Sequence, residues 1–497
     1  MKQKSVLVIG AGVGGICAAI HLRKQGFQVT VLEKNAHPGG RCDRFTRDGH
    51  HFDTGPTLMV MAPLYQAEFA ALGAPMERLL DLKRVDPTYR LIFDDRRQLA
   101  LTSDMKSMQA QLEAFEPGAF QGMLRYLIEG GRHFDLAVEK LVDRDFRQAS
   151  DFFCLGNLPL LYQIKPLVNH YRNMGSYFTD PRLKAAFTFQ DVYMGLSPYE
   201  APATFSMMPY TELAHGVWYP KGGMYAIVEA LVDLAREAGV EFAYECAVER
   251  VLVEGPAARG VQLAGGERLE AGAVLANADL PYVYDSLLPD DGQAKRLSRK
   301  RFSCSVISFF WGVDRPYPQI GPHTLFLADD YRQNFDTIIG ELGLPANPCV
   351  YVHAPARLDP SMAPPGQDTL IGIVPVGHLS EGGDQDWAAL RDQARAQVFR
   401  RLEQVGISDL QSHIKFETSF TPLSWRKRYN LVNGSTHGLC HNLLQLGYFR
   451  PGNRHSRYRN LYFAGASTHP GTGLPTAMIS GRHTARRMAD EAESWGV

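Results

Sequence analysis

The sequence predicts an α/β protein, α+β overall, with a Rossmann-like nucleotide-binding part and a second part built on a mixed β-sheet. Residues 5–33 run strand, glycine-rich turn, helix and strand, the order of a dinucleotide-binding βαβ unit. A strand, a glycine loop and a helix recur at residues 460–491. With 497 residues, the chain is too long for one hydrophobic core, so we expect two or three domains.

The first glycine turn completes the pattern G-x-G-x-x-G with Gly10, Gly12 and Gly15, between a strand at Val6–Ile9 and a helix at Ile16–Gln25. Gly10 permits the tight turn, Gly12 lets the backbone approach a pyrophosphate, and Gly15 lets helix and strand pack closely. The helix N-terminus adds unpaired N–H groups and a partial positive charge. These features predict a site for a dinucleotide.

The second strand, Gln28–Leu32, ends at Glu33, at the distance from the glycines where a ribose-binding acid is expected. Its carboxylate can accept hydrogen bonds from both ribose hydroxyls, and we include the adjacent Lys34 in the site. The competing interpretation is a secretory signal peptide, because Val6–Ile20 is apolar and follows Lys2 and Lys4. Glycines interrupt that run and no cleavage site follows, which disfavours it.

A second glycine pair, Gly39-Gly40, precedes Arg41, and Asp53-Thr-Gly-Pro-Thr57 follows. A loop that returns Arg41 to the pyrophosphate adds a bidentate cation to the helix dipole. The alternative is a surface turn with a solvated arginine. The pattern resembles the FAD-binding start of the amine oxidase and carotenoid desaturase superfamily, and we add Thr57 to the expected cofactor site.

Composition excludes several classes of function. The net charge of −1 gives no electrostatic support to a nucleic-acid partner. The seven cysteines are scattered and form no C-x-x-C pair, which indicates a reducing compartment and argues against disulfides and a zinc site. No apolar run reaches the length of a transmembrane helix. We therefore expect a cytoplasmic protein, and attachment to one membrane leaflet remains open.

The middle of the chain loses the nucleotide-binding pattern. We expect helices at Pro63–Leu72 and Met105–Tyr126, with a strand at Tyr89–Phe93. Asp151–Arg172 is rich in Leu, Phe and Tyr, with bases interleaved. It is either an amphipathic helix packed on the core or a segment in a bilayer interface, with Lys165, His170 and Arg172 toward the headgroups and Leu160 and Leu161 toward the bilayer.

From residue 214 to 285 the α/β pattern returns, with a helix at Tyr225–Ala238 and a buried strand at 273–279. Strand-like runs at 303–312, 349–354 and 369–375 and a helix at Asp386–Val405 predict a mixed sheet in a second domain. We therefore expect an FAD-binding domain at 1–70, 214–288 and 425–497, and a substrate-binding, membrane-contacting domain at 71–213 and 289–424.

The C-terminal strand Asn460–Ala464 leads into a glycine loop and a helix at Thr476–Glu491. Free N–H groups near Thr476, Ala477 and Met478 are expected to face the pyrimidine end of a flavin and to stabilise negative charge on the reduced ring.

The chain resembles the bacterial carotenoid desaturases, which act on phytoene or 4,4′-diapophytoene, nearly end to end. The residues that carry the resemblance are Gly10–Gly15, Gly39–Arg41, Asp53–Thr57, Gly216–Met224, Tyr448–Pro451 and Leu461–Pro475. The wording at Gly222–Tyr225 is closer to the C30 members. The resemblance implies flavin contacts at Gly10, Gly12, Gly14, Gly15, Glu33, Gly40, Arg41, Val248 and Gly465. Ala466 stands where many superfamily members carry an acid that reaches the ribityl chain.

The implied reaction transfers a hydride from an apolar isoprenoid to FAD, with loss of a proton from the neighbouring carbon. A quinone or oxygen then takes the electrons, and the membrane surface is the expected partner. Asp151, Glu212 and His215 are candidate proton acceptors, but no motif singles one out. We favour structural roles for them over catalysis: a helix cap, a solvated charge and a turn residue, respectively.

Three other functions fit part of the pattern. An oxygenase of the same family would oxidise a terminal methyl group of a carotenoid. An amine oxidase would need an acidic or aromatic-cage pocket, which the apolar inserts do not favour. A non-enzymatic relative of the GDP-dissociation inhibitor type would bind prenylated proteins, and the intact glycine sets at both ends argue against it.

Overall fold

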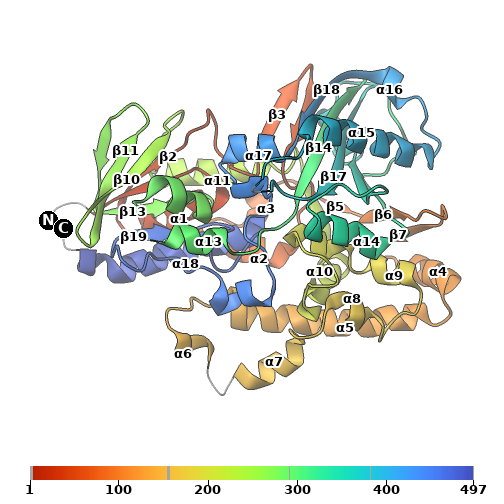
Figure 1. Cartoon of the computed structure of the whole chain (residues 1–497), viewed down its shortest axis with the longest axis horizontal. Helices are drawn as coiled ribbons and strands as arrows, with labels where there is room; N and C mark the ends of the chain where they lie inside the picture. Colours follow the sequence, from red (N-terminus) through yellow and green to blue (C-terminus); the bar gives the residue numbers. More distant parts are fainter. Residues whose placement is uncertain (1–3, 154–156, 290–291, 381, 496–497) are drawn as a thin grey trace.

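The computed structural model describes residues 4–153, 157–289, 292–380 and 382–495. Figure 1 shows three regions: a parallel sheet with its helices on the left, a large mixed sheet at the upper right, and a layer of helices below. The α/β fold class is therefore confirmed.

The parallel sheet unites strands that are far apart in the sequence. Its order is β19-β13-β1-β2-β9, and all its pairings are parallel. The strands are β1 (Ser5–Ile9), β2 (Gln28–Leu32), β9 (Glu241–Ala243), β13 (Ala273–Ala276) and β19 (Leu461–Phe463). The helices beside it are α1 (Val13–Lys24), α11 (Ala226–Glu237) and α18 (Leu474–Glu491).

This sheet is buried on both faces, as parallel sheets are. Val6 and Val8 of β1 belong to one hydrophobic core, and Leu7 and Ile9 belong to another on the opposite face. The second core includes Val251 from the three-stranded sheet β10 (Val248–Glu254), β11 (Ala257–Leu263) and β12 (Arg268–Glu270). The near-continuous apolar runs in these strands follow from burial on both sides.

The mixed sheet has seven strands in the order β18-β14-β17-β16-β15-β6-β7, and only β15 and β6 pair in parallel among them. Its strands are β6 (Tyr89–Ile92), β7 (Gln98–Leu101), β14 (Ser305–Val313), β15 (His323–Phe326), β16 (Val350–His353), β17 (Asp368–Val376) and β18 (Ile414–Phe420). The predicted mixed sheet is confirmed. Helix α15 (Trp387–Glu403) packs on one face around Trp311 and Val398.

Two short antiparallel pairs, β3 (Arg44–Arg47) with β4 (His50–Asp53) and β5 (Leu82–Val85) with β8 (Val217–Pro220), connect these parts. The smaller helices outside the helical layer described next are α2 (Ala62–Ala71), α3 (Met76–Leu79), α12 (Leu280–Tyr282), α13 (Gln293–Ser298), α14 (Tyr331–Phe335), α16 (Leu410–His413) and α17 (Pro422–Tyr429).

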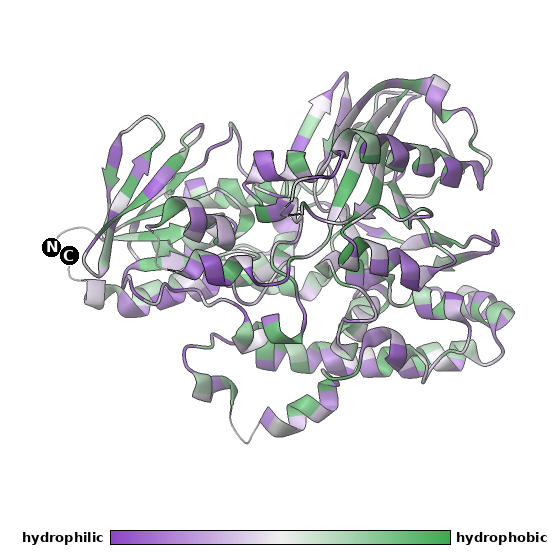
Figure 2. Ribbon diagram, in the orientation of Figure 1, coloured by the Kyte–Doolittle hydropathy of each residue, from purple (hydrophilic) through white to green (hydrophobic). Residues whose placement is uncertain are grey.

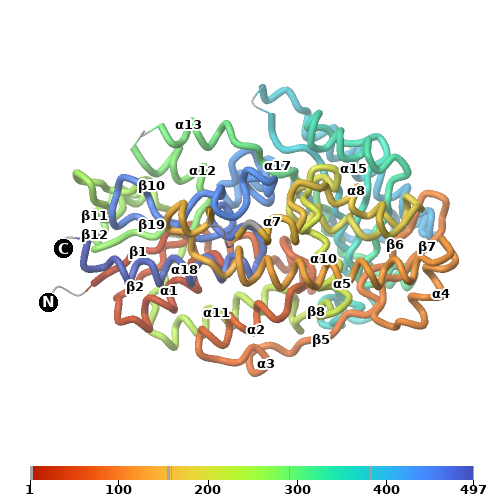
Figure 3. The backbone as a smooth tube through the Cα atoms, turned by 90° about the horizontal axis from the view of Figure 1, so that it is seen from below, coloured from red at the N-terminus to blue at the C-terminus, as the bar shows by residue number. Residues whose placement is uncertain are grey.

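The helical layer lies below both sheets, and Figure 3 shows it from that side. Its members are α4 (Met105–Phe115), α5 (Ala119–Ala137), α6 (Ala149–Phe152), α7 (Leu158–Ile164), α8 (His170–Met174), α9 (Pro181–Ala186), α10 (Met207–Tyr210), the 3₁₀ turns η3 (Phe189–Met194) and η4 (Ala203–Ser206), and the π-helical turns η1 (Val138–Val142) and η5 (Thr211–His215).

The prediction of a single helix at Met105–Tyr126 is wrong, because the helix is interrupted between α4 and α5. Pro117 falls at the break, and Gly118 takes a left-handed φ of 83° at the N-terminus of α5. A proline has no N–H to continue the first helix, and glycine adopts this φ without strain.

The segment Asp151–Arg172 is also not one helix. It forms the short helices α6 and α7 and the start of α8, and residues 154–156 lie outside the described part. His170 does not face outward: its side chain is buried, and its Nδ1 lies 2.9 Å from an Asp191 oxygen. Lys165 pairs with Glu129, whereas Arg172 is exposed. Leu160 is buried and Leu161 is exposed, so one of the two leucines predicted at the bilayer is a core residue.

The cysteines whose side chains the structure describes are mostly buried: Cys17, Cys42, Cys304, Cys349 and Cys440. Burial raises the pKa of each of these thiols. All of them are free thiols.

In Figure 2, green hydrophobic segments fill the interior of both sheets, while purple and green alternate along the helices at the lower edge. Within residues 4–153, 157–289, 292–380 and 382–495, no helix combines the length and the hydropathy needed to span a bilayer.

Helices α1 and α18 pack closely because glycine stands at their contact. A Cβ atom at Gly481 would lie 2.3 Å from the Gly14 carbonyl oxygen. Alanine would gain about 1 kcal/mol of helix propensity at Gly481, but overpacking costs about 1–3 kcal/mol. We therefore expect Gly481→Ala to lower the free energy of unfolding in denaturant titrations. Gly265→Ala is the control, because no atom lies within 4 Å of the added carbon there. An equally stable Gly481→Ala protein would contradict the close contact.

Candidate cofactor and substrate cavity

The two glycine loops meet around one side chain, Asn277, which follows β13. Its Nδ2 donates a hydrogen bond to the Gly10 carbonyl at 3.3 Å. A Cβ at Gly12 would lie 2.7 Å from Nδ2, and one at Gly465 would lie 3.0 Å from Oδ1. The carboxyl ends of β1, β13 and β19 share one edge of the parallel sheet. The glycines therefore let two loops and one amide occupy a space where side chains do not fit.

The second glycine pair lies directly on the first loop. The Gly39 N–H donates to the Ala11 carbonyl at 2.8 Å, and a Cβ at Gly40 would lie 3.3 Å from the Gly12 Cα. The loop carries Arg41 to the cavity, where its Nη1 donates to the Thr436 carbonyl at 2.9 Å. Burial lowers the pKa of Arg41, and the nearby carboxylate of Asp279 opposes that shift.

Glu33 is buried beside the first glycine loop. Its Oε2 accepts the Ala11 N–H at 2.8 Å and its Oε1 accepts the Asn35 N–H at 2.9 Å. The Cys246 N–H donates to the Glu33 carbonyl at 2.8 Å, which places Val248, at the start of β10, near this acid.

Lys34 points elsewhere. Its Nζ donates to the Lys427 carbonyl at 3.2 Å and to Asn430 Oδ1 at 3.3 Å. Lys34 therefore ties the end of β2 to the end of α17, and burial lowers its pKa.

The C-terminal loop directs the N-terminus of α18 at the cavity, where Thr476 and Ala477 are lining residues. The Ala477 N–H is not free, because it donates to the Gly473 carbonyl at 2.9 Å. A helix leaves its first N–H groups without an intrahelical partner. In α18 these belong to Leu474 and Thr476, because Pro475 has no N–H. Met478 is fully buried in the core between sheet and helices.

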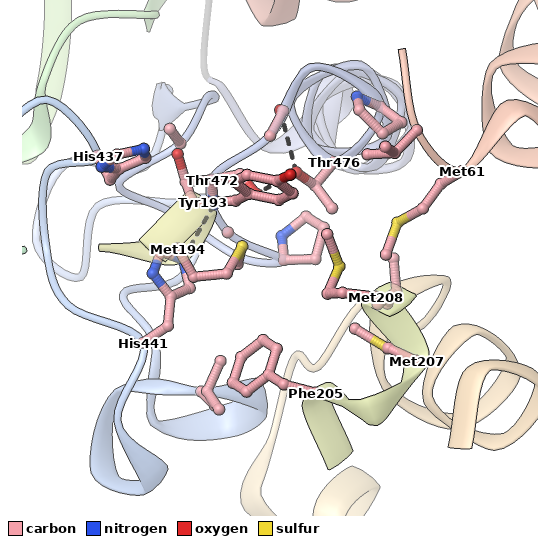
Figure 4. Close-up of a pocket in the computed structure, with 18 of the residues that line it drawn as sticks. Met61, Tyr193, Met194, Phe205, Met207, Met208, His437, His441, Thr472 and Thr476 are labelled. Atoms are coloured by element: carbon pink, nitrogen blue, oxygen red, sulfur yellow. Dashed lines mark hydrogen bonds between the residues drawn. The ribbon is translucent and has the colours of Figure 1, made fainter. Parts of the chain in front are cut away.

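Arg450 holds the C-terminal loop together. It is 3% exposed, and it donates to the carbonyls of five residues: Leu439, Cys440, Gln445, Ala466 and Thr468. Burial lowers its pKa to about 9. Nearby, the Thr472 N–H donates to His441 Nε2 at 3.0 Å (Figure 4). Ala466 lines the cavity with a methyl group, so the site offers no carboxylate at that position.

One continuous cavity of about 1880 Å³ joins the glycine loops to the outside. At one end it is lined by Gly12, Gly14, Gly40, Arg41 and Gly465. Its middle is apolar, with Met61, Phe205, Met207 and Met208 among the side chains in Figure 4. Its far end reaches α5, α7 and the turn at residues 443–449. The face of the mixed sheet opposite α15 supplies one wall, through Ser308, Tyr351 and Ile373.

A patch of hydroxyl groups interrupts the apolar wall. Thr57 Oγ1 lies 2.8 Å from the Tyr351 hydroxyl, which is 2.7 Å from His323 Nδ1. The ring centroids of Tyr89 and Tyr351 are 6.4 Å apart, and the hydroxyl groups of Tyr89 and Tyr193 form a hydrogen bond. Thr57 follows Gly55, where a Cβ would overlap the Arg41 carbonyl, so this patch lies next to the glycine-loop end.

The three candidate proton acceptors have different environments. Asp151 Oδ2 accepts the Arg147 and Gln148 N–H groups, each at 2.9 Å, and caps α6. The His215 ring packs against Phe134 and Tyr210 and is not a lining residue of the cavity.

Glu212, in contrast, is 2% exposed, and burial raises its pKa to about 8. The interpretation of Glu212 as a solvated charge is therefore wrong.

Several residues of this site were not predicted from the sequence. Asn277 and Asp279 form the polar end of the strand predicted at 273–279, and the rule that ligands bind at the carboxyl ends of parallel strands could have singled them out. Tyr89, Tyr193 and Tyr351 come from three unrelated segments, and only the folded chain brings them together.

The comparisons with known proteins agree with this geometry. The model of the flavin containing amine oxidoreductases matches residues 13–489. The chain belongs to this family. Its cofactor is FAD, and it is an oxidoreductase.

The chain is 43% identical to a zeta-carotene-forming phytoene desaturase of Myxococcus xanthus, over 100% of this chain and 96% of that protein. It is 32% identical to a 4,4′-diapophytoene desaturase of Staphylococcus haemolyticus, over 98% and 99%. These matches confirm the resemblance to carotenoid desaturases. The structure superposes on an oxidoreductase from Methanosarcina mazei with a TM-score of 0.65, at 15% identity over 96% and 99% of the two chains, which shows a shared fold.

The cavity fits an elongated dinucleotide cofactor. The glycines at its end leave backbone N–H groups and the N-terminus of the 12-residue helix α1 facing the space, an arrangement suited to phosphates. Arg41 adds a cation there, and the N-terminus of α18 enters from the other loop.

Proposed function

We propose that the protein desaturates a linear, colourless carotenoid precursor, with FAD as the oxidant. The single observation that supports this most directly is the continuous apolar cavity that begins at the glycine loops and opens among exposed hydrophobic side chains. Such a space suits a long isoprenoid with few polar handles. Phytoene is our first choice, because the relative named for it is 43% identical and the one named for the C30 substrate is 32% identical. This replaces the C30 preference based on Gly222–Tyr225.

The cofactor contacts are part of this proposal. We assign the pyrophosphate to Gly10, Gly12, Gly14, Gly15, Gly40 and Arg41, the adenosine ribose to Glu33, and the adenine surroundings to Val248. Thr57, Gly465 and Thr476 are assigned to the flavin end, with Ala477 as a wall of the cavity. Lys34 and Met478 support the site from outside, since one ties α17 to β2 and the other fills the core.

The division of the chain into a cofactor part (1–70, 214–288 and 425–497) and a substrate part (71–213 and 289–424) belongs to the same proposal. It is supported by the parallel sheet, whose strands come from the first set of ranges, and by the mixed sheet, whose strands come from the second.

Bound FAD supplies a hydride acceptor. The chain supplies alignment and a dry environment, and prior orientation of reacting groups can contribute roughly 7–11 kcal/mol. The N–H groups at the start of α18 would stabilise negative charge at the flavin end of the site. A membrane quinone or oxygen would then take the electrons from the reduced cofactor.

We also propose that the cavity opens onto a membrane surface. Seven exposed hydrophobic residues line its outer end, and we name them the apolar rim: Ile128, Phe153, Leu161, Tyr162, Leu167, Leu444 and Phe449. In the described part of the chain, only Leu79, Met105 and Leu423 are comparable exposed hydrophobics outside the rim. A concentrated apolar patch marks an interaction surface. The substrate resides in lipid, so a bilayer is the partner that explains the position of the rim.

The proposed reaction predicts new visible absorption bands when anaerobic enzyme meets liposomes that contain phytoene and a quinone. Diapophytoene liposomes run in parallel decide between C40 and C30, and denatured enzyme is the control. If neither substrate gains a double bond, while a preformed carotenoid gains an aldehyde under oxygen, the protein is a terminal oxidase.

The assigned cofactor contacts predict that FAD is bound non-covalently and leaves the chain on acid precipitation. Arg41→Ala should weaken FAD binding by about 1.5–3 kcal/mol, the value of a hydrogen bond to a charged group. Binding is measured by titrating apoprotein with FAD. Arg44→Ala is the control, because Arg44 pairs with Glu229 and is not a lining residue of the cavity. Equal losses in both variants would exclude the assigned role of Arg41.

The apolar rim predicts that the protein floats with liposomes in a density gradient. Leu161→Asp with Leu167→Asp should abolish flotation, because these side chains are 46% and 86% exposed and each buried leucine is worth about 1.5–3 kcal/mol. Leu79→Asp with Leu423→Asp changes equivalent residues outside the rim and should float normally. If both double variants float equally well, the rim is not the contact.

A further inference from the structure

A buried carboxylate stands behind the hydroxyl patch of the cavity. Glu212 lies in the π-helical turn η5 and is 2% exposed. Gln190 donates to its Oε2 at 2.9 Å, and its Oε1 has no hydrogen-bond partner in the described part of the chain. A buried oxygen without a hydrogen-bond partner costs folding free energy, so its presence calls for an explanation such as a catalytic role. No salt-bridge partner for Glu212 lies among the described residues, so the group is not part of a structural ion pair.

Tyr193 separates this carboxylate from the cavity. Its side chain is a lining residue and appears among the side chains around the space in Figure 4. Gln190, which donates to Glu212, and Tyr193 lie three residues apart in the 3₁₀ turn η3. Side chains at that spacing lie above one another on one face of a 3₁₀ turn, so Tyr193 is on the same side of the turn as Glu212. The Tyr193 hydroxyl also bonds to that of Tyr89, another lining residue. A path of polar groups thus runs from the cavity surface to Glu212.

Resting on the proposed function, the geometry points to Tyr193 and Glu212 as the path by which the protein removes the proton during desaturation. The substrate carbon that neighbours the hydride donor gives its proton to the Tyr193 oxygen, and Tyr193 passes its own proton to Glu212 Oε1. The electron pair of the C–H bond that loses its proton becomes the second bond of the new C=C. The electron pair of the other C–H bond leaves with the hydride to FAD. Tyr193 is the catalytic residue, because it reaches the cavity, and Glu212 acts through it.

The charges balance along this path. The hydride brings negative charge to the cofactor, and Glu212 loses its negative charge when it takes the proton. No new net charge is therefore left in an apolar cavity, where it would be expensive. Asp151 and His215 offer no such path, since the first caps α6 and the second faces Phe134 and Tyr210.

The surroundings of Glu212 set its pH dependence. The titratable groups that interact with it are Tyr193 on η3, Tyr89 on β6 and Tyr126 on α5, and all three keep their protons because burial raises their pKa. Burial raises the pKa of Glu212 to about 8. Only the deprotonated carboxylate accepts a proton, so the rate should rise with pH and level off above about pH 8.

The test is single-turnover reduction of enzyme-bound FAD by phytoene in liposomes, followed anaerobically by stopped flow. Glu212→Gln and Tyr193→Phe should each reduce flavin at least about 100-fold more slowly, the usual scale for general base catalysis. Both should bind FAD normally. Wild type should show the rise with pH, and Glu212→Gln should lose it. Tyr331→Phe is the matched control, because Tyr331 lines the cavity but its hydroxyl faces Thr188.

The outcomes separate this inference from the proposed function. Wild type that desaturates phytoene at a rate independent of pH, or a Glu212→Gln variant within about threefold of wild type, overturns the proton path alone. If Glu212→Gln does not fold, the wild-type pH profile and a Glu212→Asp variant, which should retain the pH dependence at reduced rate, still decide. If wild type forms no desaturated product from any precursor, the proposed function itself fails.

Discussion

The structure depends on the close approach of two strand–loop–helix units that are more than four hundred residues apart in the sequence. Gly14 and Gly481 let α1 and α18 touch, and Asn277 fills the space between their glycine loops. Because both helix N-termini then face one edge of the parallel sheet, the cofactor end of the cavity is assembled from the beginning, middle and end of the chain. The remaining segments between them are free to form the substrate part. This explains how one polypeptide can return to the same sheet after long excursions.

The middle of the cavity shows the complementary constraint. Its walls come from the mixed sheet and the helical layer. In the sheet, alternate side chains of β14, β16 and β17 face the cavity, while the others pack under α15. The period of two along a strand thus builds an apolar wall and a hydrophobic core from the same residues. The hydroxyl patch of Thr57, Tyr351, Tyr89 and Tyr193 lies where this wall meets the glycine-loop end. The proposed chemistry and the binding of the isoprenoid are therefore placed in adjacent but different surroundings.

Much of the fold could be predicted from the sequence, because its main signals are local. The strand Gln28–Leu32 matches β2, and Pro63–Leu72 and Thr476–Glu491 fall within a few residues of α2 and α18. The prediction of one helix across Gly118 was wrong, since a hydrophobic pattern can continue where the helix itself is interrupted. The glycine loops were recognisable as motifs, whereas Asn277, Tyr193 and the surroundings of Glu212 depend on long-range contacts that no local pattern encodes. His170 likewise has the sequence context of a surface base, and only the fold shows its contact with buried Asp191.

The buried thiols have a consequence for the protein's tolerance of its own chemistry. Oxidation of cysteine proceeds through the thiolate and needs access for the oxidant. Cys17, Cys42 and Cys304 have raised pKa values and little contact with solvent. Cys42 is a lining residue of the cavity assigned to the cofactor, so hydrogen peroxide formed in that cavity, when oxygen takes the electrons, would meet this thiol. Burial then protects the protein from this by-product, because a thiol with a raised pKa stays protonated and reacts slowly with peroxide.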